Sequence, residues 1–479
     1  MKPIETTRRD FLRDAVFGLH AVAATDLLLR DGKLRAGEMP ERTSRHHEAK
    51  AKQVIHIFLG GGLSHVDSFD YKPDLEKYHG KDMPSGFGKA DVFNGKVGRL
   101  HKSHYAFKRR GQSGLWVSDL FPHLAEVADN LTVIRSMVAE TANHIPGIFQ
   151  ANTGFRQMGF PAMGAWLSYG LGTENESLPS FVVLPDARGI PNAAGGAFNW
   201  TSGFLPAQHQ GVSFNTKGGS PILDLQPAGG VSADVQHARL ELLQKLDAIH
   251  LEEQAQTDPL AARIRSYELA ARMQSAIPDA TDFASEPDHI KTLYGLDREE
   301  CRDTARNCLT ARRLIERGVR MVQLWTGDGV SWDAHDDVTG TGYKSHTGEA
   351  LRVDRPVAGL IRDLDQRGLL DSTVVMITTE FGRTPFAQAD KGTLSRGRDH
   401  HPQGFTNLLV GAGLKRGIAH GATDDVGYAA IVDPVTTYDL HATVLHLLGI
   451  DHEKLTYYHN GIQRRLTNVH GHVVKGILS

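Results

Sequence analysis

Six short apolar runs recur along the chain where buried strands are expected. They are QVIHIFL (53–59), LTVIRSM (131–137), SFVVLP (180–185), VRMVQLW (319–325), STVVMITT (372–379) and, less sharply marked, FTNLLVG (405–411). The runs are rich in Val, Ile, Leu and Phe and are mostly apolar at consecutive positions instead of alternating with polar residues. That pattern is typical of strands that are covered on both faces.

Stretches with helical periodicity separate several of these runs. They are PAMGAWLSYGLG (161–172), a long stretch from about 233 to 275, GEALRVDRPVAGLIRDLDQRG (348–368) and TTYDLHATVLHLLG (436–449). Strands that alternate with helices predict an α/β fold, here a three-layer sandwich around a mainly parallel sheet. The segment from about 186 to 232 is rich in Gly, Pro, Asn and Ser, and we interpret it as a large loop-rich insertion beside the site.

Polar residues gather next to the ends of five of the expected strands. GGGLSHVDSFD follows the first run, VAETANHIPG the second, TGDGVSWDAHDD the fourth and EFGRTP the fifth, and RDHHPQGF lies just before the sixth. In open parallel sheets, ligands bind just beyond the carboxyl ends of the strands. One Asp-rich loop alone is explained by helix capping, but the recurrence at successive strand ends predicts one shared polar site.

The side chains in these segments are Asp, Glu and His, with no thiolate among them. Such a set suits Zn, Mn or Fe and, with fewer imidazoles, Mg or Ca. Two cations about 3.5–4 Å apart would clamp the attacking and leaving oxygens of an ester cleavage. Arg383 has two equally supported interpretations. It either contacts a phosphate or sulfate group through two hydrogen bonds or forms a salt bridge with Glu380.

Composition narrows the possible functions. The formal net charge of the 479 residues is −3, which gives no sign of a nucleic-acid-binding surface or a polybasic membrane patch. The two cysteines, Cys301 and Cys308, lie in a stretch that is expected to form one helix. Seven residues along a helix rise about 10.5 Å, whereas a disulfide needs Cα atoms within about 7 Å. We therefore expect both cysteines to pack within the protein without a disulfide.

The N-terminal segment has the pattern of an export signal. Paired arginines, Arg8 and Arg9, precede Phe11, Leu12 and a modest apolar run. This is the twin-arginine pattern, and the run is too short for a membrane span, which needs about 20 apolar residues. We expect residues 1–50 to be a twin-arginine signal and linker, and the protein to be periplasmic or otherwise extracytoplasmic. An amphipathic N-terminal helix is the alternative, and signal cleavage or retention as a membrane tether stays open.

The motifs at the strand ends resemble a known family. They are GGGLSHVDSFDYKP, ETANHIPGIFQANTG, SWDAHDD, ITTEFGRTP, RDHHPQGF with LLVGAGLKRG, and RRLTNVHG, which together span about 55 to 470. The chain resembles domain-of-unknown-function family 1501, which is sulfatase-like. More widely, it resembles the alkaline phosphatase-like superfamily of sulfatases, phosphomonoesterases and cofactor-independent phosphoglycerate mutases. The resemblance implies one α/β domain over 51–479 and one or two divalent metal ions, with Zn, Mn or Ca as candidates.

The resemblance also implies which residues hold the metal. The candidate ligands are Asp67, Asp333, His335, Glu380, His400 and His401. Glu380 fits the acid that follows the matching strand in the superfamily, but Phe381 stands where a second ligand is expected. Asp67 lies several residues later than the first-strand aspartate of the superfamily. Of the adjacent histidines, His401 is preferred as the ligand, with His400 in a supporting role.

The nucleophile is where the chain departs from the sulfatase pattern. Sulfatases carry a Cys or Ser nine residues before a Thr-Gly pair, but His144 stands at that distance from Thr153 and Gly154. A formylglycine mechanism is therefore not expected. His144 is a candidate metal ligand, Thr141 is a candidate nucleophile at a different offset, and direct attack by a metal-bound hydroxide is the third possibility.

Two functions from different classes follow from these features. The leading hypothesis is an exported, metal-dependent hydrolase of phosphate or sulfate esters, with a small-molecule or glycan ester as substrate. His144 and Asn143 would face the ester, and Arg383 would clamp its anion. The alternative is a catalytically degenerate extracytoplasmic binding protein, which the missing nucleophile and Phe381 motivate. A third, weaker option is a metal that only stabilises the fold.

Overall fold

All six apolar runs form strands of one sheet. The strands are β1 (Gln53–Leu59), β5 (Leu131–Val138), β6 (Phe181–Leu184), β8 (Met321–Thr326), β9 (Thr373–Thr378) and β13 (Phe405–Gly411), and three short strands join them, β7 (Val212–Ser213), β14 (Ile418–His420) and β17 (Val435–Thr436). These bounds come from a computed structural model, which describes residues 45–93, 96–188, 195–215, 258–389 and 395–479 and short pieces between 221 and 246.

The sheet is mainly parallel, with one reversed strand near its middle. The strand order is β14-β5-β13-β9-β1-β8-β6-β7, and β17 also pairs with β5. β1 pairs in parallel with β8 and β9, and β6 in parallel with β8. β13 runs antiparallel to both of its neighbours, β9 and β5. The start of β13 therefore lies at the same edge of the sheet as the carboxyl ends of the strands beside it.

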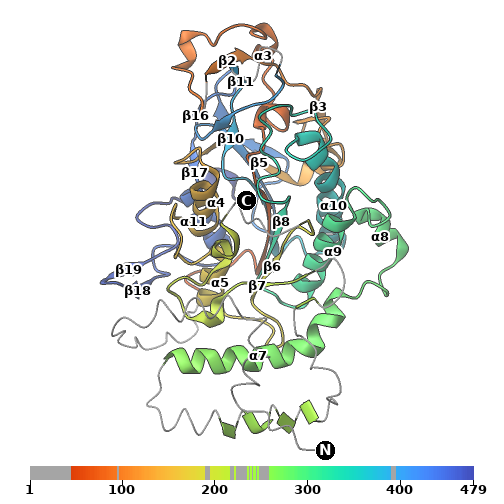
Figure 1. Ribbon diagram of the computed structural model, residues 1–479, viewed down its shortest axis with the longest axis vertical. Helices are drawn as coiled ribbons and strands as arrows, with labels where there is room; N and C mark the ends of the chain where they lie inside the picture. The colour runs from red at the N-terminus through yellow and green to blue at the C-terminus, as the bar shows by residue number, and fades with distance from the viewer. Residues whose placement is uncertain are drawn as a thin grey trace, which may run out of the picture.

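Helices cover both faces of the sheet, which gives three layers (Figure 1). One face carries α4 (His144–Thr153), α5 (Met163–Leu171) and α11 (Thr437–Leu447), and the other carries α9 (Arg302–Glu316) and α10 (His346–Gln366), against which α8 (Asp288–Tyr294) packs. A further helix, α7 (Asp258–Thr281), crosses below the sheet in this view. The observed architecture is the α/β fold with a mainly parallel central sheet that the alternating pattern predicts.

Two hydrophobic cores fill the spaces between the sheet and its two helical layers. Successive side chains of a strand point to opposite faces, and β1 divides accordingly. Ile55 and Ile57 pack in the core under α9 and α10, whereas Val54 and Phe58 pack in the core under α4, α5 and α11. This two-sided burial explains why the strand runs are almost continuously apolar in sequence.

Short helical and strand elements surround the main sheet. They are α3 (Asp74–Lys77), the ribbons β2 (Val97–Leu100) with β11 (Phe386–Gln388) and β10 (Gly382–Arg383) with β12 (His400–His401), and the hairpins β3 (Phe107–Arg110) with β4 (Leu115–Ser118), β15 (Ala422–Thr423) with β16 (Ala430–Val432) and β18 (Tyr457–His459) with β19 (Ile462–Arg464). Of these, the ribbon of β10 and β12 is built from EFGRTP and RDHHPQGF, the two segments that flank β9 and β13.

Several expectations concern regions at the margin of the described structure. The twin-arginine segment is outside the described residues, apart from the end of the predicted linker, and so are parts of the expected insertion and of the stretch from 233 to 257.

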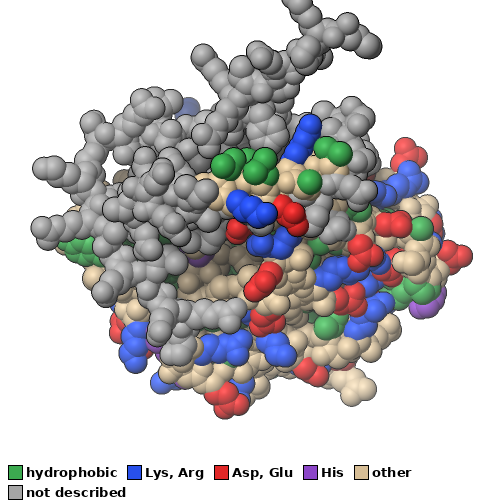
Figure 2. All heavy atoms as spheres, turned by 90° about the horizontal axis from the view of Figure 1, so that it is seen from below, with side chains coloured by type: hydrophobic (Ala, Val, Ile, Leu, Met, Phe, Trp, Pro, Cys, Tyr) green, Lys and Arg blue, Asp and Glu red, His purple; other side chains and the backbone are tan. Residues whose placement is uncertain are grey.

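Cys301 and Cys308 are buried and free, as the helical spacing predicts. No helix in the described part of the chain is long and apolar enough to cross a membrane. On the described part of the lower surface, acidic and basic side chains are interspersed (Figure 2).

Candidate metal centre

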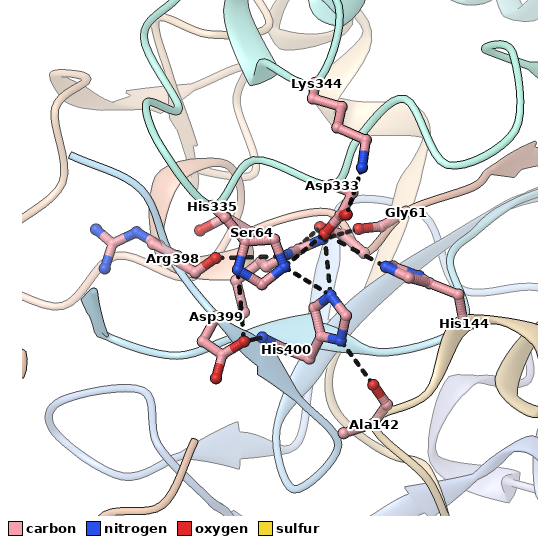
Figure 3. Close-up of polar contacts among 12 residues, drawn as sticks. Gly61, Ser64, Ala142, His144, Asp333, His335, Lys344, Arg398, Asp399 and His400 are labelled. Atoms are coloured by element: carbon pink, nitrogen blue, oxygen red, sulfur yellow. Dashed lines mark hydrogen bonds and ion pairs between the residues drawn. The ribbon is translucent and has the colours of Figure 1, made fainter. Parts of the chain in front are cut away.

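Loops from separate parts of the chain meet at the carboxyl edge of the sheet. The loops after β5, β8 and β9 and the segment before β13 supply the side chains of the site. The antiparallel direction of β13 is what brings RDHHPQGF to this edge. Asp333 lies at the centre, and its side chain is almost fully buried (Figure 3).

Three imidazoles face one oxygen of Asp333. The Oδ1 atom lies 2.9 Å from His335 Nε2, 2.9 Å from His400 Nε2 and 3.3 Å from His144 Nε2 (Figure 3). The Nε2 atoms of His335 and His400 are themselves 2.9 Å apart. Two overlapping groups of residues could each hold a metal ion, His144–Asp333–His400 and His335–Asp399–His400. In each group the ligand atoms lie within 4.8 Å of one another.

The outer nitrogens of two of these imidazoles determine where their protons sit. His400 Nδ1 lies 2.7 Å from the Ala142 carbonyl oxygen, which can only accept a hydrogen bond. His144 Nδ1 lies 2.7 Å from Glu380 Oε1, a carboxylate oxygen. A neutral imidazole has only one N–H, so His400 presents the lone pair of its Nε2 atom to Asp333 Oδ1, and His144 does the same in its neutral form. His144 Nε2 is buried and has no hydrogen-bond donor opposite it.

Lone pairs that converge on a carboxylate repel one another unless a positive charge lies between them. A divalent cation satisfies all of these atoms at once, because neutral imidazole nitrogens and carboxylate oxygens are its ordinary ligands. Burial lowers the pKa of His400 to about 3, so this imidazole is neutral near pH 7 and available as a ligand. For Asp333, burial disfavours the charge, but Arg383 and the imidazoles outweigh it and hold the pKa well below its usual range. The donor set therefore fits a divalent metal.

Glu380 supports His144 from behind. Its carboxylate accepts hydrogen bonds from the Gly61 backbone N–H at 2.9 and 3.1 Å and is only 1% exposed. Burial opposes protonation of His144, but hydrogen bonds to Asp333 and Glu380 outweigh it and raise the pKa of this histidine, so a metal bound at Nε2 would take the place of a proton. The pairing of a carboxylate with the outer nitrogen of a ligand histidine fixes the tautomer and the orientation of the ring. In this arrangement Glu380 orients His144.

Arg383 is enclosed within the protein. Its side chain is fully buried, and its guanidinium donates to the carbonyl oxygens of Gly62 at 2.9 Å, Arg398 at 3.1 Å and Gly61. It also donates to Asp333 Oδ1 at 2.7 Å. Because its Nε and both Nη atoms already donate within the protein, Arg383 is placed to hold Asp333 and the Gly61 loop, away from the open side of the site.

The structure does not bring Asp67 into the cluster. This buried carboxylate accepts hydrogen bonds from Arg398 Nε at 2.5 Å and Ser64 Oγ at 2.6 Å. Burial disfavours its charge, but Arg398 and Ser64 outweigh it and lower the pKa of Asp67 below its usual range. Asp67 and Arg398 thus form a separate internal ion pair, which is joined to the site through the hydrogen bond from Arg383 to the Arg398 carbonyl.

The two adjacent histidines point to opposite sides of β12. His400 enters the cluster, whereas His401 Nε2 donates to the Tyr428 carbonyl oxygen, and its ring stacks on Tyr428 with centroids 4.3 Å apart. Burial lowers the pKa of His401 to about 3. The sequence-based preference is for His401 as the ligand, whereas this geometry favours His400. Asn143 is exposed and occupies the N-cap position of α4, directly before His144, without a capping hydrogen bond from its side chain.

Two residues of the site escaped the sequence reasoning. Asp399 stands within RDHHPQGF, and its Oδ1 atom lies 3.6 Å from His335 Nδ1. Its place beside His400 was a usable signal. Lys344 Nζ lies 3.0 Å from Asp333 Oδ2, on the other side of the carboxylate from the histidines (Figure 3). A lone lysine in a glycine-containing loop carries no pattern that would single it out.

Comparison with known proteins gives distant structural matches and one family. No curated protein matches the sequence. A protein in the alkaline phosphatase superfamily from Vibrio parahaemolyticus aligns with a TM-score of 0.37 and 12% identity over 92% of this chain and 75% of its own. Phosphonate monoester hydrolase from Silicibacter pomeroyi aligns with a TM-score of 0.39 and 11% identity, over 89% and 76%. Alkaline phosphatase from the Antarctic bacterium TAB5 gives 0.33 and 9%, over 83% and 98%. Residues 51–478 match the family described as Protein of unknown function (DUF1501), and the chain belongs to that family.

Proposed function

We propose that this protein is a metal-dependent hydrolase of phosphate or sulfate esters. The observation that carries the proposal is the convergence of three imidazole Nε2 atoms on Asp333 Oδ1, within 2.9 to 3.3 Å. Asp333, His144, His335 and His400 would hold one divalent ion, and Asp399 with His335 and His400 offers an alternative position for it. Zn and Mn suit the imidazole-rich first position best.

The chemistry divides between the metal and the chain. A bound divalent cation would act as a Lewis acid that polarises an ester oxygen. Glu380 keeps the Nδ1 proton of His144 in place, so that the Nε2 lone pair of this residue would be directed at the ion. Arg383 fixes Asp333, and the buried Gly61 loop closes the inner side of the site. Glu380 and Arg383 thus act by holding the metal ligands His144 and Asp333 in position.

Thr141 and water are the two candidate nucleophiles. Thr141 lies in the turn before α4, and its hydroxyl oxygen accepts a hydrogen bond from the Asn143 backbone N–H at 3.1 Å. Thr141→Ala separates the two candidates. If the hydroxyl attacks, the variant loses turnover and keeps its metal, and if water attacks, the rate changes little.

A screen of aryl phosphates and aryl sulfates with added Zn, Mn or Ca tests the proposed activity. We expect a metal-dependent rate that is lost in Asp333→Ala and in His144→Ala. His472→Ala is a matched control, because this histidine is exposed and distant in sequence from the site segments. A protein that binds metal but turns over none of these esters would instead support the binding-protein alternative.

We also propose export by the twin-arginine route, which rests on the N-terminal sequence. Replacement of Arg8 and Arg9 together by lysine tests it. The expected result is that the protein moves from the extracytoplasmic fraction to the cytoplasm. Unchanged export of the double variant would contradict this proposal and would have no bearing on the proposed metal centre.

A further inference from the structure

A cleft opens beside the candidate metal centre. It has a volume of about 540 Å³, which is in the range that holds a small organic ligand. Asp333 and His335 form one wall, and residues of the loop before α10 form much of the rest. Two of the candidate metal ligands therefore line this cleft, and its other lining residues are placed to contact a substrate.

Lys344 is the sole Lys or Arg among the described residues that line this cleft. Its side chain is 44% exposed, and its Nζ atom lies 3.0 Å from Asp333 Oδ2. Arg383, the cation that the sequence suggested for anion binding, is 0% exposed and donates to three backbone carbonyls. Lys344 is thus the cation that can reach a ligand in the cleft.

The backbone at Lys344 has an unusual conformation. Its φ angle is +59°, in the left-handed region that residues other than Gly, Asn and Asp seldom adopt. The next residue, Ser345, caps α10 by accepting a hydrogen bond from the Gly348 N–H at 3.3 Å. Local strain of this kind persists where the surrounding structure holds a functional side chain in position.

Tyr343 lies next to Lys344 and presents an aromatic ring to solvent. The residue is 56% exposed, and its hydroxyl donates to the Asp328 carbonyl oxygen at 3.1 Å. The hydrogen bond fixes the tip of the side chain, and the ring lines the cleft. An exposed, fixed aromatic face next to a cation suits a ligand that has a ring attached to an anionic group.

We propose that Lys344 binds the tetrahedral oxyanion of the substrate and that Tyr343 packs against a ring in its alcohol part. The ligand class is a phosphate or sulfate ester of a cyclic alcohol, so this inference rests on the proposed function. The ion pair with Asp333 is the resting arrangement. A divalent cation held at Oδ1 would repel the ammonium across the same carboxylate, which would leave Lys344 free to turn to the anion of the substrate.

Calorimetric titration of the full-length, Mn-loaded protein with inorganic phosphate, and separately with sulfate, tests the role of Lys344. Lys344→Met and Lys344→Gly should bind phosphate at least about tenfold more weakly, because a charge-assisted contact is lost. Lys344→Arg should restore most of the affinity. Lys77→Met is the control, since Lys77 is 67% exposed and forms an ion pair with Asp74 within its own short helix. Whichever anion, phosphate or sulfate, binds more tightly identifies the oxyanion of the substrate.

Two further readouts separate anion binding from a structural role. Glycine tolerates a positive φ, so Lys344→Gly should keep or raise the melting temperature. Its Mn affinity should be unchanged or tighter, because a competing positive charge next to Asp333 is gone. Unchanged phosphate affinity in Lys344→Gly with Mn bound would overturn this inference alone. A wild-type protein that takes up no Mn would overturn the proposed function as well.

Tyr343 is tested with two substrates that differ only in their alcohol. Tyr343→Ala should raise the KM for phenyl phosphate about fivefold and leave the KM for methyl phosphate unchanged, since only the first has a ring. The affinity for inorganic phosphate should stay at the wild-type value. Equal changes of KM for both esters would overturn the assignment of the ring-binding surface.

Discussion

The two faces of the ribbon formed by β10 and β12 show how one short segment serves a site and a core. Arg383 and His400 are cross-strand partners, and both contact Asp333 on one face. Gly382 and His401 are the next pair, and they face the other way. A Cβ atom at Gly382 would lie 2.6 Å from the Gly404 carbonyl oxygen, so this face is tightly packed.

Hydrogen-bond partners distinguish the two faces. On the packed face, His401 donates to a carbonyl oxygen and stacks on Tyr428, as a structural histidine does. On the site face, the Nε2 atoms of His144 and His400 converge on the same oxygen of Asp333. A buried histidine with donors and acceptors matched stabilises a fold, whereas imidazoles with converging lone pairs indicate a cation site.

The strongest test of this comparison is the same substitution at the two neighbouring histidines. His400→Ala should reduce bound metal to less than about one tenth of the wild-type content, because a ligand is lost. His401→Ala should keep the metal and lower the free energy of unfolding by about 2–4 kcal/mol, because it leaves a cavity and an unpaired carbonyl. Elemental analysis by plasma mass spectrometry and urea unfolding in chelator measure the two effects. If His401→Ala lost the metal and His400→Ala kept it, His401 would be the ligand and His400 the structural histidine.

Arg383→Lys tests whether the arginine on the site face is structural. A lysine cannot reproduce the contacts to three carbonyls and Asp333, so the free energy of unfolding should fall by about 2–4 kcal/mol. Urea unfolding with and without metal measures it. A variant with wild-type stability and a raised KM would instead support Arg383 as the anion clamp.

Glu380→Gln tests how far the site face extends beyond the ribbon. If Glu380 orients His144, the variant should bind metal about 10–100-fold more weakly and still reach full occupancy at high metal concentration. Competition with a chromogenic chelator measures the affinity. Complete loss of metal, as expected for Asp333→Ala, would make Glu380 a direct ligand, which is what the family resemblance implies.

The pH dependence of stability tests the packed face. Burial lowers the pKa of His401 to about 3, against about 6.5 in the unfolded chain, so the unfolded state binds more protons between these values. Stability is therefore full above pH 6.5 and falls as the pH drops. His401→Gln, which keeps a neutral donor, should reduce the loss between pH 7 and pH 5 by about 2 kcal/mol. Parallel pH profiles of the metal-free proteins would contradict the assignment.

The sequence predicts more of the sheet than of the site. All six apolar runs are strands, because burial on both faces leaves a signal in the composition of each run. The antiparallel direction of β13 left no such signal, since a buried strand reads the same in both directions. Which of His400 and His401 faces the site depends on the register of a two-residue ribbon, and Gly382 fixes it through packing that no local pattern records.

Anomalous scattering from crystals of the wild-type protein grown with Zn tests the central claim most directly. We expect a peak at the zinc edge about 2.0–2.2 Å from the Nε2 atoms of His144 and His400 and from an oxygen of Asp333. Lys344 should then have moved away from Asp333. Crystals with no peak among these residues, and with Lys344 still paired to Asp333, would contradict the metal centre and the function proposed from it.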